Sequence, residues 1–180
     1  MGRVNHVLLV GMTGSGKSTV APLVAAGLDR PWVDTDEEVE RATGKTVEAT
    51  FWEDGEAAFR GEERRALAVA VAVANPAVIA VAGGAVLDAD NYRLIENSGT
   101  VVWLRAGMET LIERVGDGSG RPLLEGDAPR ALSELDKVRS PLYAALADAI
   151  VDVDGRSPEE VAALVIEAVG AATAPSEPPR

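Results

Sequence analysis

The fold is decided by the stretch Gly11-Met12-Thr13-Gly14-Ser15-Gly16-Lys17-Ser18. It matches the pattern G-x-x-x-x-G-K-[ST], whose glycines let backbone N–H groups curl around phosphate oxygens. Lys17 would reach the outer phosphates, and Ser18 would offer its hydroxyl to Mg²⁺. An apolar run at residues 7–10 comes before the motif, and a helical pattern at residues 17–28 follows it. Because a helix N-terminus attracts anions, this order of strand, loop and helix predicts a site for nucleotide phosphates.

Short apolar runs alternate with helical patterns along the chain. Strands are expected at residues 7–10, 32–33, 78–82, 101–104 and 149–153. Helices are expected at residues 17–28, 36–43, 56–73, 88–98, 108–115 and 129–148, and from Ser157 onward. Pro141 is expected to kink or break the helix that contains it. Five strands alternating with helices predict an α/β fold with a doubly wound parallel sheet.

The length of 180 residues predicts one domain, which we place at residues 1–170. A glycine-rich stretch at about residues 116–128, which includes Pro122, is expected to form a mobile lid loop. The tail at residues 171–180 carries three prolines and is expected to be disordered.

Composition narrows the class of protein. The net charge of −12 disfavours a nucleic-acid surface, because phosphate contacts need clustered Lys and Arg. The chain has no cysteine, which fits a reducing compartment, and its single histidine, His6, excludes a zinc site built on several histidines. No apolar run is long enough to span a membrane, and residues 1–10 do not resemble a signal peptide. We therefore expect a soluble, cytoplasmic protein with neither a nucleic-acid nor a membrane partner.

Two carboxylates follow the second expected strand. Asp34 and Asp36 would point to the same side of an extended segment, at the strand end where open α/β sheets bind ligands. One could serve Mg²⁺ while the other holds an acceptor hydroxyl. Alternatively, Asp36 only caps the helix that follows. The third strand ends at glycines rather than at an Asp, and no N-K-x-D guanine motif is present, so this pair supplies the better candidate acids.

The chain resembles shikimate kinase from Val7 to Val169. The matching segments, in order, are Gly11 to Thr19, Asp34-Thr35-Asp36, Phe51, Gly55-Glu56, Phe59-Arg60, Gly83-Gly84-Ala85-Val86, Arg121-Pro122-Leu123-Leu124 and Arg139-Ser140-Pro141-Leu142-Tyr143. The resemblance implies transfer of the γ-phosphate of ATP, with Mg²⁺, to the 3-hydroxyl of shikimate, a step toward chorismate and the aromatic amino acids. It also implies a P-loop kinase fold with sheet order 2-3-1-4-5, as in the nucleoside monophosphate kinases, and we expect a monomer.

The resemblance also assigns roles by position. The residues implied in catalysis are Lys17, Asp36 and Arg121. Those implied in ATP binding are Gly14, Ser15, Gly16, Lys17, Ser18, Thr19, Arg114, Arg121 and Arg156. Those implied in binding shikimate are Asp36, Arg60, Gly83, Gly84 and Arg139, the two arginines as a clamp on its carboxylate. Ser18 and, through water, Asp34 would hold the magnesium ion.

The two clamp arginines have simpler interpretations without the resemblance. Arg60 could be a solvated helix residue near Glu56 and Glu63. Arg139 could pair with Asp136 or Glu134 on its own helix. A planar guanidinium nevertheless binds a carboxylate bidentately, which favours arginine for a clamp.

One departure from the family concerns Ala82. The family usually has three successive glycines where this chain has Ala82-Gly83-Gly84. We expect Ala82 to complete the strand at residues 78–82, although its methyl group could instead narrow the substrate pocket.

Two other functions remain open from the sequence. One is a related small-molecule kinase that acts on another hydroxy acid such as gluconate. The other is a nucleotide-binding regulator without catalysis, which predicts the loss of Lys17, Asp36 or Arg121, and all three are present.

Overall fold

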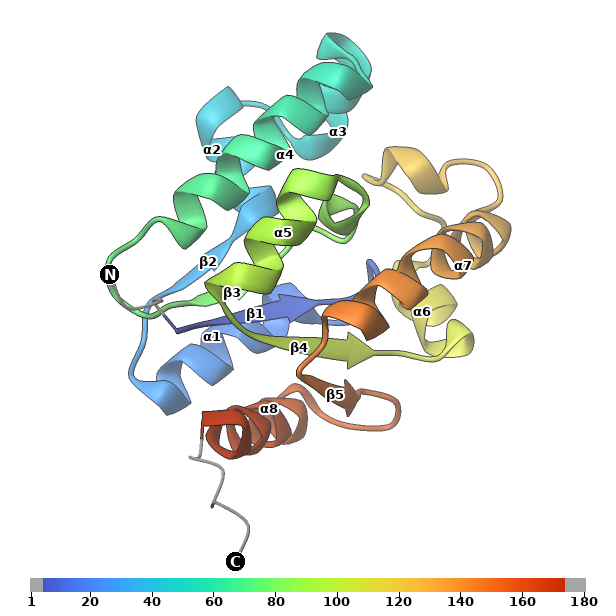
Figure 1. The fold of residues 1–180 in the computed structure, drawn as a ribbon. Coiled ribbons are helices and arrows are strands. Elements are labelled where there is room, and N and C mark those ends of the chain that lie inside the picture. The colour runs from blue at the N-terminus through green and yellow to red at the C-terminus, as the bar shows by residue number, and fades with distance from the viewer. Residues whose placement is uncertain (1–4, 174–180) are drawn as a thin grey trace, which may run out of the picture.

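The computed structural model describes residues 5–173, which form a five-stranded parallel sheet with helices on both faces (Figure 1). The strands are β1 (His6–Val10), β2 (Trp32–Asp34), β3 (Val78–Ala80), β4 (Gly99–Arg105) and β5 (Ala149–Asp152). Their order is β2-β3-β1-β4-β5, so the predicted fold class and strand order are confirmed. In the register, Leu8 of β1 lies between Ile79 of β3 and Val101 of β4.

Eight α-helices are assigned within the described residues. They are α1 (Lys17–Leu28), α2 (Thr35–Thr43), α3 (Val47–Ala49), α4 (Glu56–Val71), α5 (Ala89–Ser98), α6 (Met108–Val115), α7 (Ala128–Leu146) and α8 (Pro158–Thr173). Three short turns of other helix types complete the fold: a π-helical turn at Thr50–Asp54 and 3₁₀ turns at Ala85–Leu87 and Pro122–Leu124. None of the helices in residues 5–173 combines the length and apolar character that a membrane crossing requires.

The sheet is buried on both faces. Successive residues of β1 point to opposite sides, so that Leu8 and Val10 join a core with α4 to α7, whereas Val7 and Leu9 join a core with α1 and α8. Figure 1 shows these two groups of helices on opposite sides of the sheet. Burial on both faces explains why the strands are unbroken apolar runs and not alternating patterns.

Several sequence predictions need correction at element ends. β3 ends at Ala80, so Ala82 does not complete the strand as expected. The helix cap after β2 is Asp34, whose carboxylate accepts the N–H of Asp36 at 2.9 Å, and not Asp36 itself. α7 continues through Pro141 without a break, because residues such as Tyr143 beyond the proline are buried in the core.

The C-terminal helix is longer than expected. α8 extends to Thr173, past the predicted start of the disordered tail at residue 171. The rest of the predicted tail, residues 174–180, lies outside the described part of the chain.

His6 joins β1 to the connection between α4 and β3. Its ring is 1% exposed. Nδ1 accepts the backbone N–H of Ala77 at 3.1 Å, and Nε2 lies 3.2 Å from the carbonyl oxygen of Val71. The neutral ring, with its proton on Nε2, satisfies both contacts, whereas a second proton on Nδ1 would face the N–H of Ala77. Burial accordingly lowers the pKa of His6 below its usual value.

We expect His6 to make the stability of the fold depend on pH. Because the folded-state pKa lies below the unfolded value of 6.5, the unfolded chain binds more protons as the pH falls through 6.5, and stability is lost. The variant His6→Asn keeps an acceptor for Ala77 but does not titrate. Urea unfolding at pH 7.5 and pH 5 should show the wild type losing its advantage over the variant at the lower pH. An advantage that stays constant between the two pH values would contradict the assignment.

Candidate active site

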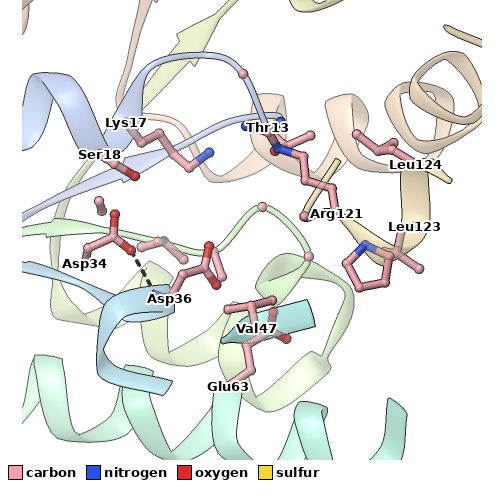
Figure 2. A pocket seen from close by; sticks show the side chains of 18 of the residues that line it. Thr13, Lys17, Ser18, Asp34, Asp36, Val47, Glu63, Arg121, Leu123 and Leu124 are labelled. Atoms are coloured by element: carbon pink, nitrogen blue, oxygen red, sulfur yellow. Dashed lines mark hydrogen bonds between the residues drawn. The ribbon is translucent and has the colours of Figure 1, made fainter. Parts of the chain in front are cut away.

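A cavity of about 520 Å³ opens at the carboxyl ends of β1, β2 and β3. This is the edge at which open α/β sheets bind ligands. Thirteen of the residues predicted for the site line it: Gly14, Gly16, Lys17, Ser18, Thr19, Asp34, Asp36, Arg60, Gly83, Gly84, Arg114, Arg121 and Arg139. Figure 2 shows side chains from both ends of the cavity pointing into it.

A second cavity of about 190 Å³ adjoins the first and shares Gly16, Thr19 and Arg114 with it. It is lined by the two remaining predicted residues, Ser15 and Arg156. Arg114 Nη1 donates to the carbonyl oxygen of Gly14 at 3.4 Å. This contact places its guanidinium beside the phosphate loop, as we name residues 11–18. The structure therefore brings together every residue predicted for the site.

The phosphate loop has the backbone that its glycines predict. Gly14 and Gly16 have φ values of 84° and 96°, a region that L side chains rarely adopt. Lys17 Nζ donates to the carbonyl oxygens of Gly11 and Met12, at 2.8 and 3.0 Å. Burial lowers the pKa of Lys17 to about 8, while the nearby Asp36 acts in the opposite direction. A bound phosphate would restore the pKa of this lysine, since it would place negative charge beside the ammonium group.

Asp34 and Asp36 differ in their surroundings although they are neighbours. Asp34 is buried and its carboxylate is fixed as the cap of α2. Asp36 points into the cavity (Figure 2). Burial, and then the charge of Asp34, raise the pKa of Asp36 to about 6, with Lys17 opposing them. A carboxylate with a pKa this close to neutrality suits a general base.

Ser18 and Asp34 offer oxygen ligands that fit Mg²⁺. Figure 2 shows the hydroxyl of Ser18 and the carboxylate of Asp34 on the same side of the cavity. No group of three or more His, Cys, Asp or Glu side chains in residues 5–173 could hold a metal by itself. Mg²⁺ commonly binds through one or two protein oxygens together with substrate phosphates and water. The donor set is therefore suited to an ion that arrives with a nucleotide.

Arg60 enters the cavity from α4 and is held by acidic neighbours. Its Nη1 donates to both carboxylate oxygens of Glu63 at 3.1 Å, and its Nη2 donates to Glu56 at 3.4 Å. Glu63 is 3% exposed and also lines the cavity. Burial raises the pKa of Glu63, and Arg60 lowers it. The pairing considered from the sequence exists, but it holds the guanidinium at the cavity wall rather than in solvent.

Arg139 enters the cavity from α7 and lacks an acidic partner. It is 4% exposed, and its Nε is buried without a hydrogen-bond partner. The two carboxylates that could have paired with it are engaged elsewhere: Asp136 accepts from Ser140, and Glu134 accepts from Lys137. Within residues 5–173 Arg139 forms no ion pair. A buried guanidinium without an ion-pair partner is costly, so this site is suited to an anionic ligand.

Gly83 and Gly84 allow the two arginines to approach the same loop. A Cβ atom added to Gly84 would lie 2.7 Å from Nη1 of Arg60. A Cβ atom added to Gly83 would lie 3.5 Å from Nη1 of Arg139 and 3.2 Å from the carbonyl oxygen of Gly11. The two guanidiniums therefore flank one glycine pair, an arrangement that is suited to a shared carboxylate ligand.

Arg121 reaches the phosphate loop from the expected lid. Its Nε donates to Thr13 Oγ1 at 3.1 Å. The 3₁₀ turn that follows it lines the cavity, and Leu124 in that turn is 1% exposed and belongs to the core. The lid segment is thus anchored at Leu124, while its mobility stays a prediction.

Sequence reasoning gave no role to three residues of the site. Glu63 supports Arg60, Thr35 accepts the N–H of Ala82, and Tyr143 donates to the carbonyl oxygen of Gly83. Helical spacing was the available signal for two of them, because Glu63 follows Arg60 by three residues and Tyr143 follows Arg139 by four.

A P-loop phosphotransferase is the class of protein that this fold and these cavities define. A sequence model of the shikimate kinase family matches residues 13–170. The chain belongs to the shikimate kinase family and is an ATP-dependent kinase.

Individual relatives support the same assignment. The chain is 42% identical over 166 residues to the shikimate kinase of Moorella thermoacetica, covering 92% of this chain and 95% of that one. It is 43% identical over 166 residues to that of Symbiobacterium thermophilum, covering 90% and 94%. Among solved structures, the shikimate kinase of Acinetobacter baumannii in complex with shikimate superposes with a TM-score of 0.90 at 31% identity, covering 94% and 95%. A gluconokinase of Sinorhizobium meliloti superposes with a TM-score of 0.57 at 14% identity, which shows a shared fold alone.

Proposed function

We propose that the protein transfers the γ-phosphoryl group of ATP to the 3-hydroxyl of shikimate, giving ADP and shikimate 3-phosphate. The observation that carries the proposal is the pair of guanidiniums at Gly83 and Gly84, on the cavity that also holds Asp36; one of them, that of Arg139, forms no ion pair within residues 5–173. Such a site fits a small molecule with a carboxylate at one end and a hydroxyl at the other.

The residues of the cavity have distinct parts in the proposed reaction. Arg60 and Arg139 bind the carboxylate of shikimate, and Asp36 orients the hydroxyl and takes its proton. The hydroxyl oxygen bonds to the γ-phosphorus as the bond between that phosphorus and the bridging oxygen of ADP breaks. Lys17 and Arg121 stabilise the charge on the transferred group, since phosphoryl transfer depends mainly on positioning and electrostatics.

The nucleotide occupies the remaining part of the two cavities in this proposal. Gly14 to Thr19 cradle the phosphates, and the smaller cavity, with Arg114 and Arg156, takes the adenine. Mg²⁺ would be held by Ser18 and, through water, by Asp34, and it would neutralise charge on the β- and γ-phosphates. Because one copy supplies every one of these residues, the proposed active unit is a monomer. Its proposed location is the cytoplasm.

A panel of acceptors tests the proposal. The protein is incubated with ATP and Mg²⁺ and with shikimate, quinate, gluconate or glycerate, and ADP release is followed. We expect turnover with shikimate and little with the others. Preferential turnover of gluconate would replace the proposal with the alternative kinase, and ATP binding without turnover of any acceptor would favour a regulator.

The arginine clamp predicts a selective effect on the acceptor. Arg60→Lys and Arg139→Lys keep a positive charge but lose the planar fork, so each should raise the Michaelis constant for shikimate about tenfold or more. The constant for ATP should change little. Because both side chains bind one carboxylate, the double variant should show non-additive losses in a double-mutant cycle. Equal damage to ATP affinity would refute the clamp.

Replacement of Ala82 by glycine is expected to have a small effect on the use of shikimate, although Ala82 lies in the cavity wall. Its φ is not positive, and its methyl group packs into the core that includes Val81 and Val86. We expect Ala82→Gly to change the Michaelis constant for shikimate by less than about threefold, under 1 kcal/mol. Because glycine gives the unfolded chain more conformational freedom than alanine, the free energy of unfolding of Ala82→Gly should be lower by roughly 0.5 to 1 kcal/mol. Poor use of shikimate by the wild type, with a large improvement in the variant, would indicate a different natural acceptor.

A further inference from the structure

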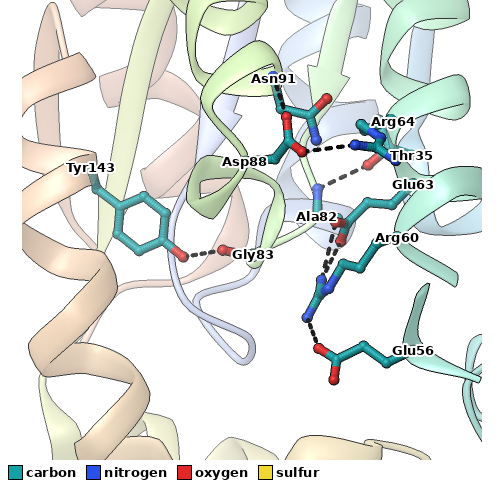
Figure 3. A network of polar contacts seen from close by, with 10 residues as sticks. All are labelled: Thr35, Glu56, Arg60, Glu63, Arg64, Ala82, Gly83, Asp88, Asn91 and Tyr143. Carbon is teal, nitrogen blue, oxygen red and sulfur yellow. Dashed lines mark hydrogen bonds and ion pairs between the residues drawn. The ribbon is translucent and has the colours of Figure 1, made fainter.

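A short loop, residues 82–84, lines the cavity beside the proposed base and the proposed carboxylate clamp; we name it the partition loop. It follows β3, and all three of its residues line the cavity. Figure 3 shows Thr35 approaching it from one side and Tyr143 from the other. Neither residue lines the cavity, so neither contacts a ligand there directly.

Thr35 binds the partition loop from the side of the acids. It is 1% exposed, and its Oγ1 accepts the backbone N–H of Ala82 at 2.8 Å. Thr35 is also the first residue of α2 and stands between Asp34, which caps that helix, and Asp36. A shift of the partition loop relative to Thr35 would therefore move the loop relative to Asp36.

Tyr143 binds the partition loop from the side of Arg139. It is 0% exposed, and its Oη donates to the carbonyl oxygen of Gly83 at 2.6 Å. Tyr143 lies one helical turn after Arg139 on α7, so both side chains are on the same face of the helix. Its ring packs against Trp103, with centroids 5.9 Å apart, and the contact fixes the position of the hydroxyl.

The structure assigns Thr35 and Tyr143 as a pair of positioning residues that hold the partition loop between the element that carries Asp36 and the element that carries Arg139. Consecutive residues of one loop, Ala82 and Gly83, are each tied by a buried hydroxyl to a different functional element. The ties fix the distance between Asp36 and the guanidinium of Arg139, which sets the distance between the hydroxyl and the carboxylate of the acceptor. A displacement of about 1 Å in such geometry can lower the rate about a hundredfold. The kinetic consequences of this inference rest on the proposed function, whereas the two hydrogen bonds are present whatever the function is.

The two ties predict different kinetic effects. Loss of the Thr35 hydroxyl releases the partition loop from the segment that carries Asp36. Thr35→Val should therefore lower kcat by roughly five- to a hundredfold, which corresponds to the free-energy cost of an unsatisfied buried N–H. Loss of the Tyr143 hydroxyl releases Gly83 and removes the interaction of that hydroxyl with Arg139, so Tyr143→Phe should mainly raise the Michaelis constant for shikimate, by roughly fivefold or more. The Michaelis constant for ATP should change less than about twofold in both.

Matched variants separate positioning from folding. Thr35→Ser keeps the hydroxyl and should restore kcat to within about threefold of the wild type. Thr35→Ala removes the hydroxyl without adding a methyl group, and is measured in parallel in case the valine variant does not fold. Thr100→Val and Tyr92→Phe are the controls, since both residues lie outside the cavity lining and should keep wild-type kinetics.

Amide hydrogen exchange of the protein without ligands tests the ties independently of any reaction. The exchange of the Ala82 amide should become at least tenfold faster in Thr35→Val than in Thr35→Ser or the wild type. Unchanged exchange would overturn the inference, and so would equal kinetic losses in Thr35→Ser and Thr35→Val. If the wild type does not phosphorylate shikimate, the proposed function fails, while the exchange measurement still decides whether Thr35 holds the loop.

Discussion

Replacement of Lys17 by methionine is expected to leave a folded protein with almost no phosphoryl transfer. Lys17 is the lysine of the phosphate loop, and its Nζ sits on the carbonyl oxygens of Gly11 and Met12 at the cavity. Methionine has a similar length but carries no charge, so the variant loses the cation that faces the developing charge on the transferred group. We expect turnover to fall by about three orders of magnitude or more, measured as ADP release with saturating ATP and shikimate.

The structure adds an expectation about stability. The pKa of Lys17 is lowered to about 8 by burial, so the fold holds this charge less favourably than water does. At pH 7 the wild type carries that cost and the methionine variant does not, so thermal unfolding should show no loss of stability. Lys137→Met is the matched control, because Lys137 is exposed and pairs only with Glu134 among the contacts of its side chain in residues 5–173. Near-normal turnover of Lys17→Met would overturn the assignment of the phosphate loop.

The phosphate loop was the most predictable part of the site because its geometry is local. Eight consecutive residues determine the turn, the positive φ of Gly14 and Gly16, and the start of α1. The strands were predictable for a related reason: a sheet covered on both faces leaves unbroken apolar runs. The strand order was not predictable in this way, because it depends on the crossover connections, and hydrophobic periodicity does not record these. It came from the resemblance alone.

The two clamp arginines show where sequence reasoning ends. Each has an acidic residue three positions away, Glu63 for Arg60 and Asp136 for Arg139, so both could have been ordinary surface pairs. The structure separates them: Arg60 is held by Glu63, whereas Nε of Arg139 is buried and has no hydrogen-bond partner in the part of the chain that the structure describes. Only the packing of α4 and α7 around the cavity decides this difference, and no pattern within either helix contains it.

The same limit applies to Asp34 and Asp36. Their spacing predicted that both carboxylates would face one side of the segment. The alternative was that Asp36 serves only as the cap of the helix that follows. In the structure the cap is Asp34, because α2 begins one residue earlier than expected, at Thr35. The tertiary contact of Thr35 with Ala82 accompanies that earlier start. A local pattern could not predict it, since the two residues are far apart in the chain.

Asp36→Asn is expected to lower turnover by several orders of magnitude while ATP still binds. The amide has nearly the shape of the carboxylate, but it cannot accept the proton of the acceptor hydroxyl. Asp34, which is proposed to serve the metal, remains in place as the cap of α2. Steady-state kinetics and nucleotide titration separate the two effects. If ATP binding fell as steeply as turnover, Asp36 would belong to the metal site instead.

The raised pKa of Asp36 predicts how pH affects both activity and stability. In the wild type the pKa is about 6 against an ordinary value of 3.8, so the folded protein binds more protons than the unfolded chain between these values. Stability contributed by the protonated form is therefore present below pH 3.8 and lost as the pH rises through 6. The loss is at most about 3 kcal/mol, since one pKa unit corresponds to about 1.36 kcal/mol. Asparagine does not titrate, so Asp36→Asn should be more stable than the wild type at pH 7.5, with a smaller difference at pH 4.5, in urea unfolding.

In the same pH range kcat/KM of the wild type should fall about tenfold per pH unit below 6, because only the carboxylate form can act as the base. A variant that is inactive and also less stable at pH 7.5 would show that Asp36 supports the fold rather than the reaction.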